Sequence, residues 1–327
     1  MAEGKVVFVT EGLSDEFNNQ VLRSTPAGLT TLMIPNGVSD EEKIAALTDA
    51  DFILTFSGTF SEWVLRAARK LRFIQLIPAG YDLMDLPLLQ ELGIPCATSG
   101  DANAPAVAEH TIMLILALAR KFQRADATVR AGGWRFDNPS TNPNTYFDLV
   151  GKRVGIVGLG NIGQHVAKRL RGFDCQMQYT KRHPLPVEQE QALGVTCVSL
   201  REIFTTSDIV TLNVALTTET ERLVGRDELA LMKPSAILIN TSRGRVVDEV
   251  ALIEELQQGK IAGAGLDVFE PEPPAPDNPL LQMDNVIVTP HVAGGSRDSI
   301  TRVLAFSWQN IKDVWEGKVP RAVVTTA

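Results

Sequence analysis

Cysteine is scarce in this chain. Only three occur among its 327 residues, Cys96, Cys175 and Cys197, and no two of them have the C-x-x-C spacing. An odd number of widely separated cysteines provides neither a disulfide framework nor a typical thiolate metal site. We therefore expect no metal ion, and the cysteine usage is typical of the reducing cytoplasm.

Long apolar runs and an excess of positive charge are also missing. The longest apolar stretch, residues 111–119, is too short to cross a bilayer, and residues 1–5 do not begin a signal peptide. Asp and Glu (39) outnumber Lys and Arg (31), and the net charge of −8 argues against general nucleic-acid binding. We expect a cytoplasmic protein that associates with neither nucleic acid nor membrane.

Short β-rich segments occur in two series and alternate with helical patterns, which predicts an α/β fold with parallel sheets and crossover helices. Between the two series, residues 103–130 have the pattern of one long helix. In the second series Asp248 is placed to cap a helix over residues 249–258, and Gly259 to end it in a left-handed conformation. The expected strands are residues 6–9, 52–54, 73–76 and 94–96, then 154–157, 176–179, 209–212, 236–239, 263–268 and 286–288.

A glycine-rich turn follows the first strand of the second series. Residues 154–163 read VGIVGLGNIG, and a helical pattern follows over residues 164–171. In a dinucleotide site with this G-x-G-x-x-G pattern, the glycines make the tight turn, admit the phosphates and let the helix pack on the strand. The helix N-terminus then attracts the pyrophosphate. The pattern predicts a dinucleotide site that includes Gly158, Gly160, Asn161, Ile162 and Gly163.

The end of the next expected strand indicates which dinucleotide binds. NAD-binding folds place a carboxylate there for the ribose hydroxyls, but residues 180–183 read TKRH and the first acid beyond them is Glu188. Lys181 and Arg182 could bind a 2′-phosphate by charge-assisted hydrogen bonds, although basic pairs at a strand end are often only solvated. The missing acid favours NADP(H), with NAD(H) possible.

Three later strands each lead to a charged or titratable side chain. Arg243 follows residues 236–239, Glu270 and Glu272 follow residues 263–268, and His291 follows residues 286–288. The carboxyl ends of parallel strands form the ligand-binding edge of a doubly wound sheet. Taken singly, these side chains could be a surface ion pair, solvated carboxylates and a cap for local carbonyls.

Taken together with the dinucleotide motif, the same side chains predict a reductase site. The arginine would hold a substrate carboxylate in a bidentate manner and polarise the adjoining carbonyl group. The histidine would act as general acid in reduction and as general base in oxidation, and a nearby carboxylate would orient its ring.

These motifs and their order resemble the D-isomer-specific 2-hydroxyacid dehydrogenase family, over essentially the whole chain. The matching segments are residues 78–82 (PAGYD), 103–110 (NAPAVAEH), 158–163 (GLGNIG), 240–244 (NTSRG), 266–273 (LDVFEPEP) and 289–291 (TPH). The resemblance implies reduction of a 2-keto acid with a nicotinamide cofactor. It makes Arg243 the substrate-binding arginine, His291 the proton donor, and Glu272 rather than Glu270 the carboxylate paired with that histidine.

The resemblance also implies further contacts. Ala79 and Gly80 match a loop whose backbone N–H groups hold the substrate carboxylate, and Asp267 matches a residue that contacts the nicotinamide carboxamide. The substrate-binding residues expected on this basis are Ser57, Ala79, Gly80, Arg243 and His291. The further cofactor-binding residues are Val214, Ala215, Thr241, Ser242, Asp267, His291, Ala293 and Gly294.

The order of the two series predicts two doubly wound parallel-sheet domains. A central Rossmann nucleotide domain would span residues 102–294, and a discontinuous, flavodoxin-like substrate domain would combine residues 1–101 with 295–327. Substrate would bind between the domains, at the carboxyl ends of the strands. The domain order of the resembled family fits this arrangement and implies a homodimer formed through the nucleotide domain.

Departures from the family patterns narrow the resemblance. Residues 212–216 read LNVAL where L-H-x-P-L is common, so the loop over the adenosine departs from the family pattern, although its backbone could still line the cofactor. Glu272 argues against the formate dehydrogenase branch, which has Gln there, and Ala79 against the phosphite-oxidising branch, which has Lys. No further C-terminal domain follows, so we do not expect a long phosphoglycerate dehydrogenase. The basic residues 180–183 make the NADPH-linked glyoxylate/hydroxypyruvate reductases the most similar branch.

Two alternatives stay open. Phe56, Tyr81 and Trp134 could line a pocket for a larger or aromatic keto acid, although ordinary packing also explains them. A catalytically silent NAD(P)-sensing protein is the alternative from another functional class, and the presence of Arg243, Glu272 and His291 argues against it.

Overall fold

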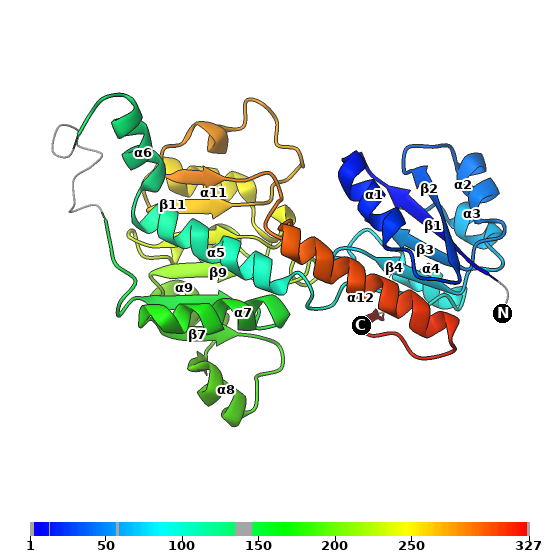
Figure 1. Ribbon diagram of the computed structural model, residues 1–327. Helices are drawn as coiled ribbons and strands as arrows, with labels where there is room; N and C mark the ends of the chain where they lie inside the picture. Colours follow the sequence, from blue (N-terminus) through cyan, green and yellow to red (C-terminus); the bar gives the residue numbers. More distant parts are fainter. Residues whose placement is uncertain (1–2, 13, 57–58, 135–145, 326–327) are drawn as a thin grey trace. The chain divides into compact units, whose positions relative to one another are not determined.

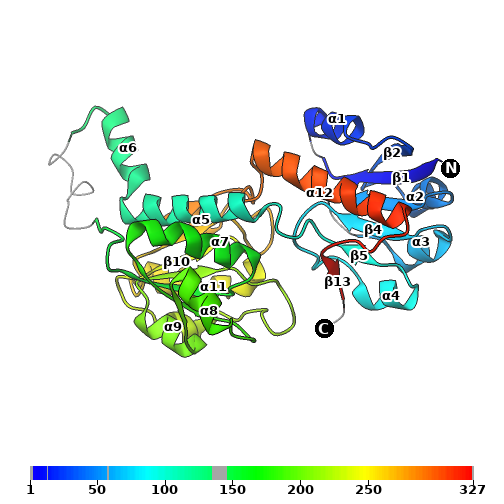
Figure 2. The ribbon, with the colours of Figure 1, turned by 60° about the horizontal axis from the view of Figure 1, so that its bottom comes forward.

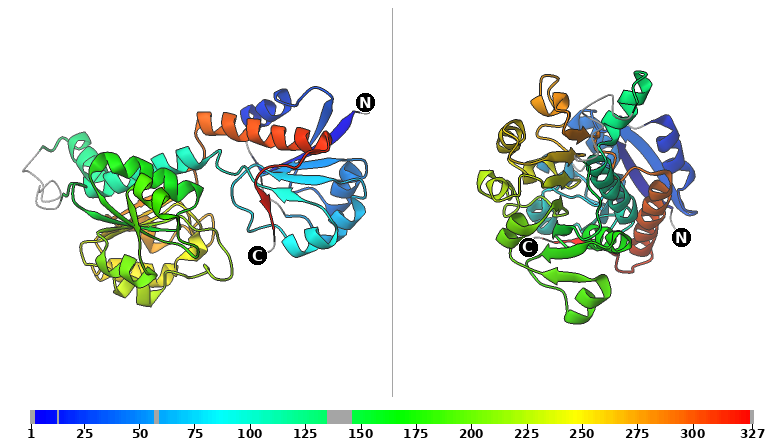
Figure 3. Two further views of the ribbon diagram at one scale, coloured as in Figure 1. Left: turned by 90° about the horizontal axis from the view of Figure 1, so that it is seen from below. Right: turned by 90° about the vertical axis from the view of Figure 1, so that its left-hand side faces the viewer.

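The computed structural model describes residues 3–12, 14–56, 59–134 and 146–325 (Figure 1). The chain forms two compact units. Unit 1 comprises Met1–Asn103 and Ser296–Ala327, and unit 2 comprises Ala104–Gly295. In each unit, helices cover both faces of one sheet (Figure 3), which confirms the predicted α/β class with two doubly wound sheets. No helix among the described residues is long and apolar enough to cross a membrane.

The sheet of unit 1 has the strand order β13-β5-β4-β3-β1-β2. Its five parallel strands follow the flavodoxin-like order, and the short strand β13 pairs antiparallel with β5. The strands are β1 (Gly4–Thr10), β2 (Leu29–Pro35), β3 (Phe52–Thr55), β4 (Phe73–Leu76), β5 (Cys96–Ala97) and β13 (Val323–Val324). The helices are α1 (Asp15–Arg23), α2 (Asp40–Leu47), α3 (Glu62–Ala67), α4 (Leu86–Glu91) and α12 (Arg297–Trp315).

Side chains of β1 alternate between two cores on opposite faces of this sheet. Val7 and Val9 pack in the core that α2, α3 and α4 cover, whereas Val6 and Phe8 pack in the other. The helix α12 lies against this second face of the sheet (Figure 2), and its Trp308 is buried in the second core. The last part of the chain therefore completes unit 1.

Strand β2 is not among the strands that the sequence pattern predicts. This strand is the edge of its sheet and pairs only with β1, and most of its side chains are at least partly exposed. Its sequence, LTTLMIP, therefore lacks the continuous apolar run of a strand buried on both faces. An edge position also explains why a proline is tolerated at its end.

The sheet of unit 2 is fully parallel, with the order β12-β11-β10-β9-β6-β7-β8. This is the Rossmann order with one added strand, and the order reverses between β6 and β9. The strands are β6 (Arg153–Val157), β7 (Gln176–Thr180), β8 (Val195–Cys197), β9 (Ile209–Leu212), β10 (Ile237–Asn240), β11 (Gly263–Leu266) and β12 (Val286–Val288). The helices are α5 (Ala104–Ala119), α6 (Phe122–Arg130), α7 (Asn161–Leu170), α8 (Val187–Leu193), α9 (Leu200–Thr206), α10 (Arg226–Ala230) and α11 (Glu249–Gln257).

The single long helix expected over residues 103–130 is wrong, because the chain breaks into α5 and α6. Lys121 separates them with a left-handed φ of +48°, which a right-handed helix cannot contain. The carbonyl of Ala119 accepts the N–H of Phe147 (3.1 Å), from the segment that leads back into the sheet. A hydrogen bond between residues so far apart in sequence leaves no local signal in the helical pattern.

Candidate active site

The glycine-rich turn joins β6 to α7. Gly158 has a φ of +91°, and a Cβ atom there would lie 2.6 Å from the carbonyl oxygen of Asn213. A Cβ atom on Gly163 would lie 2.2 Å from the carbonyl oxygen of Gly158. A Cβ atom on Gly160, in contrast, would meet no described atom within 4 Å. The outer two glycines are therefore needed for packing, and the middle one leaves open space beside the turn.

The N-terminus of α7 adds hydrogen-bond donors to this turn. The helix begins at Asn161, and no side chain of the described residues caps it. Its first N–H groups, including those of Asn161 and Ile162, can therefore bind an anion. The N–H of Gly158 itself donates to the carbonyl of Thr180 (3.0 Å), which ties the turn to the end of β7. Uncapped donors beside an unobstructed glycine fit the pyrophosphate of a nicotinamide dinucleotide.

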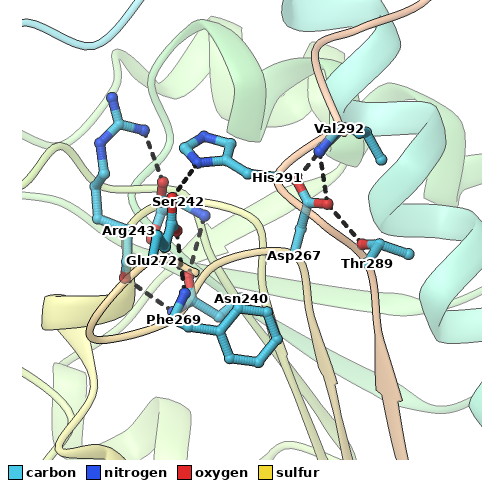
Figure 4. Close-up of polar contacts among 10 residues, drawn as sticks. Asn240, Ser242, Arg243, Asp267, Phe269, Glu272, Thr289, His291 and Val292 are labelled. Atoms are coloured by element: carbon cyan, nitrogen blue, oxygen red, sulfur yellow. Dashed lines mark hydrogen bonds and ion pairs between the residues drawn. The ribbon is translucent and has the colours of Figure 1, made fainter. Parts of the chain in front are cut away.

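The loops that carry the predicted catalytic side chains follow three adjacent strands, β10, β11 and β12. Because these strands are parallel, their carboxyl ends meet at one edge of the unit 2 sheet. Arg243 follows β10, Glu272 follows β11 and His291 follows β12, and Figure 4 shows their side chains grouped there. The structure thus brings the three residues together within one unit.

The turn after β10 is held by a buried amide. Asn240 is 1% exposed, and its Oδ1 accepts hydrogen bonds from Ser242 N (3.0 Å) and Ser242 Oγ (2.8 Å). Its Nδ2 donates to the carbonyl of Arg243 (2.9 Å), so one side chain fixes both following residues. The guanidinium of Arg243 donates from Nη1 to the carbonyl of Ser242 (2.8 Å). The backbone that presents Arg243 is therefore well determined.

A second glycine contact joins this turn to the loop after β11. A Cβ atom on Gly244 would lie only 1.9 Å from the carbonyl oxygen of Phe269, so the two backbones touch where no side chain could fit. The N–H of Phe269 donates to Glu272 Oε1 (3.1 Å), which orients that carboxylate. Gly244 thus sets the spacing between the loops of Arg243 and Glu272.

Glu272 and His291 form a direct pair, with 2.7 Å between Glu272 Oε2 and His291 Nδ1. An ionised carboxylate can only accept, so hydrogen-bond chemistry assigns the proton to Nδ1 and leaves Nε2 for another partner. Burial opposes the ionisation of Glu272, but the pKa of this carboxyl group still lies below its usual value. The causes are the hydrogen bond and charge of His291, the N–H of Phe269 and the charge of Arg243. The imidazole is 47% exposed and can reach a ligand from its Nε2 side.

The backbone of His291 is positioned by Asp267, which is completely buried. The Asp267 carboxylate accepts from Val292 N (2.9 Å) and Ala293 N (2.8 Å). The backbone carbonyl of Asp267 accepts from His291 N (2.8 Å). His291 has a left-handed φ of +52°, a conformation that costs free energy in a residue other than glycine. The three hydrogen bonds to Asp267 hold the turn in that conformation.

His110 on α5 extends this hydrogen-bond network. Thr289 Oγ1 donates to Asp267 Oδ1 (2.6 Å), and His110 Nε2 lies 2.9 Å from the same hydroxyl. Because the single hydroxyl proton of Thr289 goes to the carboxylate, the hydroxyl must accept from His110, which assigns the Nε2–H tautomer. Burial lowers the pKa of His110, against the charge of Asp267, and thus favours the neutral ring.

The sequence of this part of the chain matches a family model. Residues 112–293 match the model described as the NAD binding domain of D-isomer specific 2-hydroxyacid dehydrogenases. This chain belongs to the D-isomer specific 2-hydroxyacid dehydrogenase family. The match includes the glycine-rich turn and the three strand ends that carry Arg243, Glu272 and His291.

Three similar proteins show how far the family likeness extends. The chain is 38% identical to the glyoxylate reductase of Korarchaeum cryptofilum over 266 residues, which cover 80% of this chain and 78% of the relative. It is 38% identical to the D-3-phosphoglycerate dehydrogenase of Methanocaldococcus jannaschii over 296 residues, 89% of this chain but only 55% of the relative, so it spans about half of that protein's length. The chain also resembles a solved structure, that of an NADPH-dependent glyoxylate/hydroxypyruvate reductase from Sinorhizobium meliloti in complex with NADP and malonate. The TM-score is 0.85 and the identity 29%, and the match covers 99% of this chain and 97% of that chain.

The other predicted cofactor residues of this family member also lie at the carboxyl edge of the unit 2 sheet. Lys181 and Arg182 are exposed directly after β7, and Val214 and Ala215 follow β9. The remaining ones are arranged as follows: Thr241 Oγ1 lies 3.0 Å from Thr111 Oγ1, Ser242 Oγ bonds Asn240, and Ala293 and Gly294 follow the His291 turn. Their contacts with a cofactor stay predictions. No cluster of three or more His, Cys, Asp and Glu suited to a metal ion occurs in the part of the chain that the structure describes.

The predicted substrate residues outside unit 2 belong to unit 1. Ala79 and Gly80 are half-buried in the segment after β4, and Ser57 lies outside the described residues. Of the aromatic residues considered for a larger substrate, Phe56 packs edge-on against Phe17, with 6.0 Å between the ring centroids. The substrate contacts of all these residues stay predictions.

The sequence motifs do not mark Asn240, Thr289 and His110 as positioning residues. All three lie within the segments matched to the family, but the matches pointed to their neighbours. Their roles come from hydrogen bonds between loops and a helix far apart in sequence, such as the 179 residues between His110 and Thr289. Only the polar character of Asn240 and Thr289 at buried strand ends, and of His110 within the largely apolar helix α5, could have indicated them.

Proposed function

We propose that this chain uses NADPH to reduce a small 2-keto acid, of the glyoxylate or hydroxypyruvate type, to the D-2-hydroxy acid. The observation that carries the proposal is the 2.7 Å contact between His291 and Glu272, at the same sheet edge as Arg243. Membership of the family and the likeness to named glyoxylate reductases support it.

Each of the three side chains has a task in this reaction. When bound, the nicotinamide supplies a hydride to the carbonyl carbon of the substrate. Protonated His291 donates its Nε2 proton to the carbonyl oxygen, so that an alcohol forms and the ring becomes neutral. Glu272 accepts from Nδ1 throughout, which orients the ring and stabilises its charged form before the transfer. Arg243 binds the substrate carboxylate and stabilises the negative charge that develops on the oxygen.

The preference for NADPH over NADH rests on the segment after β7. Lys181 and Arg182 are both exposed there, and the first carboxylate beyond the strand is Glu188 on α8. A 2′-phosphate would meet positive charge and no opposing carboxylate in residues 180–187. NADH lacks this phosphate, so it gains nothing from the two cations.

A panel of substrates tests the proposal. Glyoxylate, hydroxypyruvate, pyruvate and phenylpyruvate are each reduced with NADPH and with NADH, and D-3-phosphoglycerate is oxidised with both cofactors because of the M. jannaschii relative. We expect the highest kcat/KM for glyoxylate or hydroxypyruvate with NADPH. The highest kcat/KM with phenylpyruvate or D-3-phosphoglycerate would contradict the proposed substrate class. A higher kcat/KM with NADH than with NADPH would contradict the proposed cofactor. Nucleotide binding without any turnover would contradict the enzyme itself and favour a sensing protein.

We also propose a homodimer formed through unit 2. Helix α6 projects from the body of that unit (Figure 1), and large apolar side chains are exposed on and around it. Phe122 is 62% exposed, Val129 56% and Trp134 63%. Phe122 and Val129 are two turns apart on α6 and therefore share a face, and exposed apolar side chains on one face indicate an interaction surface. Light scattering should give the mass of a dimer, and Phe122→Glu with Val129→Glu should shift it to a monomer; a monomeric parent protein would contradict the proposal.

A further inference from the structure

We propose that Tyr179 is a specificity-determining residue for the cofactor, because its hydroxyl positions the loop that carries Lys181 and Arg182. It would act through that loop and not by touching the cofactor. The inference rests on the proposed preference for NADPH and goes beyond it by naming the group that prepares the loop for a 2′-phosphate.

Tyr179 makes two hydrogen bonds from the interior of unit 2. It lies on β7 and is completely buried among apolar side chains. Its hydroxyl oxygen accepts the N–H of Leu185 (2.7 Å) and donates to Glu190 Oε1 (2.7 Å) on α8. Burial raises the pKa of the phenol, so the proton needed for the second bond stays in place. One hydroxyl therefore joins β7, the loop after it and α8; Figure 1 shows these two elements at one side of unit 2.

The loop after β7 is fixed at each end by a hydrogen bond. At its start, the carbonyl of Thr180 accepts the N–H of Gly158, from the glycine-rich turn. At its end, the N–H of Leu185 is bound by Tyr179. Only residues 181–184 lie between the two anchors, and all four are exposed. Lys181 and Arg182 are thus presented from a short segment whose position is set relative to the proposed pyrophosphate site.

A fixed loop should bind an anion more tightly than a free one. Ordering a flexible loop costs conformational entropy, and a loop that is already ordered avoids this cost on binding. The hydroxyl of Tyr179 supplies the order, whereas its ring supplies core packing. Tyr179→Phe keeps the ring and removes only the hydroxyl, so it separates the two contributions. Tyr179→Phe should therefore weaken binding of the 2′-phosphate and leave the affinity for the rest of the nucleotide unchanged.

Two fragments of the cofactor make the test independent of turnover. The dissociation constants of 2′,5′-ADP and 5′-AMP are measured by calorimetry for the parent protein, Tyr179→Phe and the control Tyr146→Phe. We expect the parent to prefer 2′,5′-ADP, and Tyr179→Phe to weaken 2′,5′-ADP about tenfold while 5′-AMP changes less than about twofold. Tyr146→Phe makes the same chemical change elsewhere in unit 2 and should leave both constants unchanged. Amide exchange at Leu185 should also be faster in Tyr179→Phe.

The outcomes distinguish this inference from the proposal on which it rests. A parent protein without preference for 2′,5′-ADP would overturn the NADPH proposal, and this inference with it. A parent with the preference, and a Tyr179→Phe variant that retains it, would overturn this inference alone. Should Tyr179→Phe fail to fold, Glu190→Ala removes the acceptor of the hydroxyl proton, so that the hydroxyl is free to turn away from Leu185 while Tyr179 stays in place. The same selective loss is then expected, and an unchanged ratio would overturn the inference.

Discussion

Replacement of His291 by asparagine should lower kcat for reduction of the keto acid by about 10²- to 10⁴-fold, with a much smaller change in KM. The side chain that bonds Glu272 would still be polar, but no group could give up a proton from the position of Nε2. The comparison is made by steady-state kinetics with the best substrate of the panel.

Cofactor binding provides the control for this variant. His291 is also expected to contact the cofactor, but the proposed contacts with the pyrophosphate and the 2′-phosphate come from the glycine-rich turn and residues 181–184. The dissociation constant of NADPH should therefore change far less than kcat. Turnover at the parental rate would refute His291 as the proton donor. Loss of both turnover and NADPH binding would instead point to a damaged nucleotide site, caused by release of the backbone that Asp267 holds.

Arg243→Lys should lower kcat/KM for the keto acid by about 10²-fold or more, although the charge is retained. An ammonium group cannot present two parallel N–H donors to a carboxylate. The guanidinium also donates to the carbonyl of Ser242, and an ammonium group could not bind the substrate in a planar fork and keep this bond. Arg243→Ala should be no more than slightly worse than Arg243→Lys. This order separates the geometry of the guanidinium from its charge.

Arg245→Lys is the matched control for that substitution. Arg245 lies two residues further along the same turn, is exposed and forms an ion pair with Glu221. An exposed pair of this kind tolerates a change of cation, so near-normal kcat/KM is expected. An Arg243→Lys variant as active as Arg245→Lys would show that Arg243 does not hold the substrate carboxylate as a planar fork.

The fold could be predicted from the sequence where local patterns decide it. Buried strands such as β6 and β10 have continuous apolar runs, and both were expected within a residue of their bounds. The caps of α11 are confirmed as well, since Asp248 accepts from Ala251 N and Gly259 has a φ of +65°. In these cases the residue type and the conformation are linked by nearest-neighbour chemistry.

Features that depend on distant contacts could not be predicted in this way. The edge strand β2 has a mixed pattern because only one side of it is paired, and the break at Lys121 depends on a segment that returns to α5. The hydroxyl of Tyr179 bonds the loop and helix that follow it, a role that nothing in the residue type indicates. Sequence patterns placed the ends of the strands, but not the hydrogen bonds that position the loops after them.

The three candidate catalytic residues show the same division. Their location after β10, β11 and β12 follows from the alternation of strands and helices. The choice of Glu272 over Glu270 came from the family resemblance, and in the structure Glu272 contacts His291, whereas the N–H of Glu270 bonds Glu249. Neither strand lengths nor apolar patterns could distinguish the two glutamates.

We propose that Arg243, His291 and Glu272 act on one bound 2-keto acid. A crystal structure of the protein with NADP⁺ and oxamate, an unreactive analogue of such an acid, would show the three side chains with a bound ligand. We predict that the oxamate carboxylate contacts the guanidinium of Arg243 and that its amide carbonyl oxygen accepts a hydrogen bond from His291 Nε2, with Nδ1 still on Glu272. Oxamate bound away from both side chains, or a His291 ring that turns away from it, would contradict the claim.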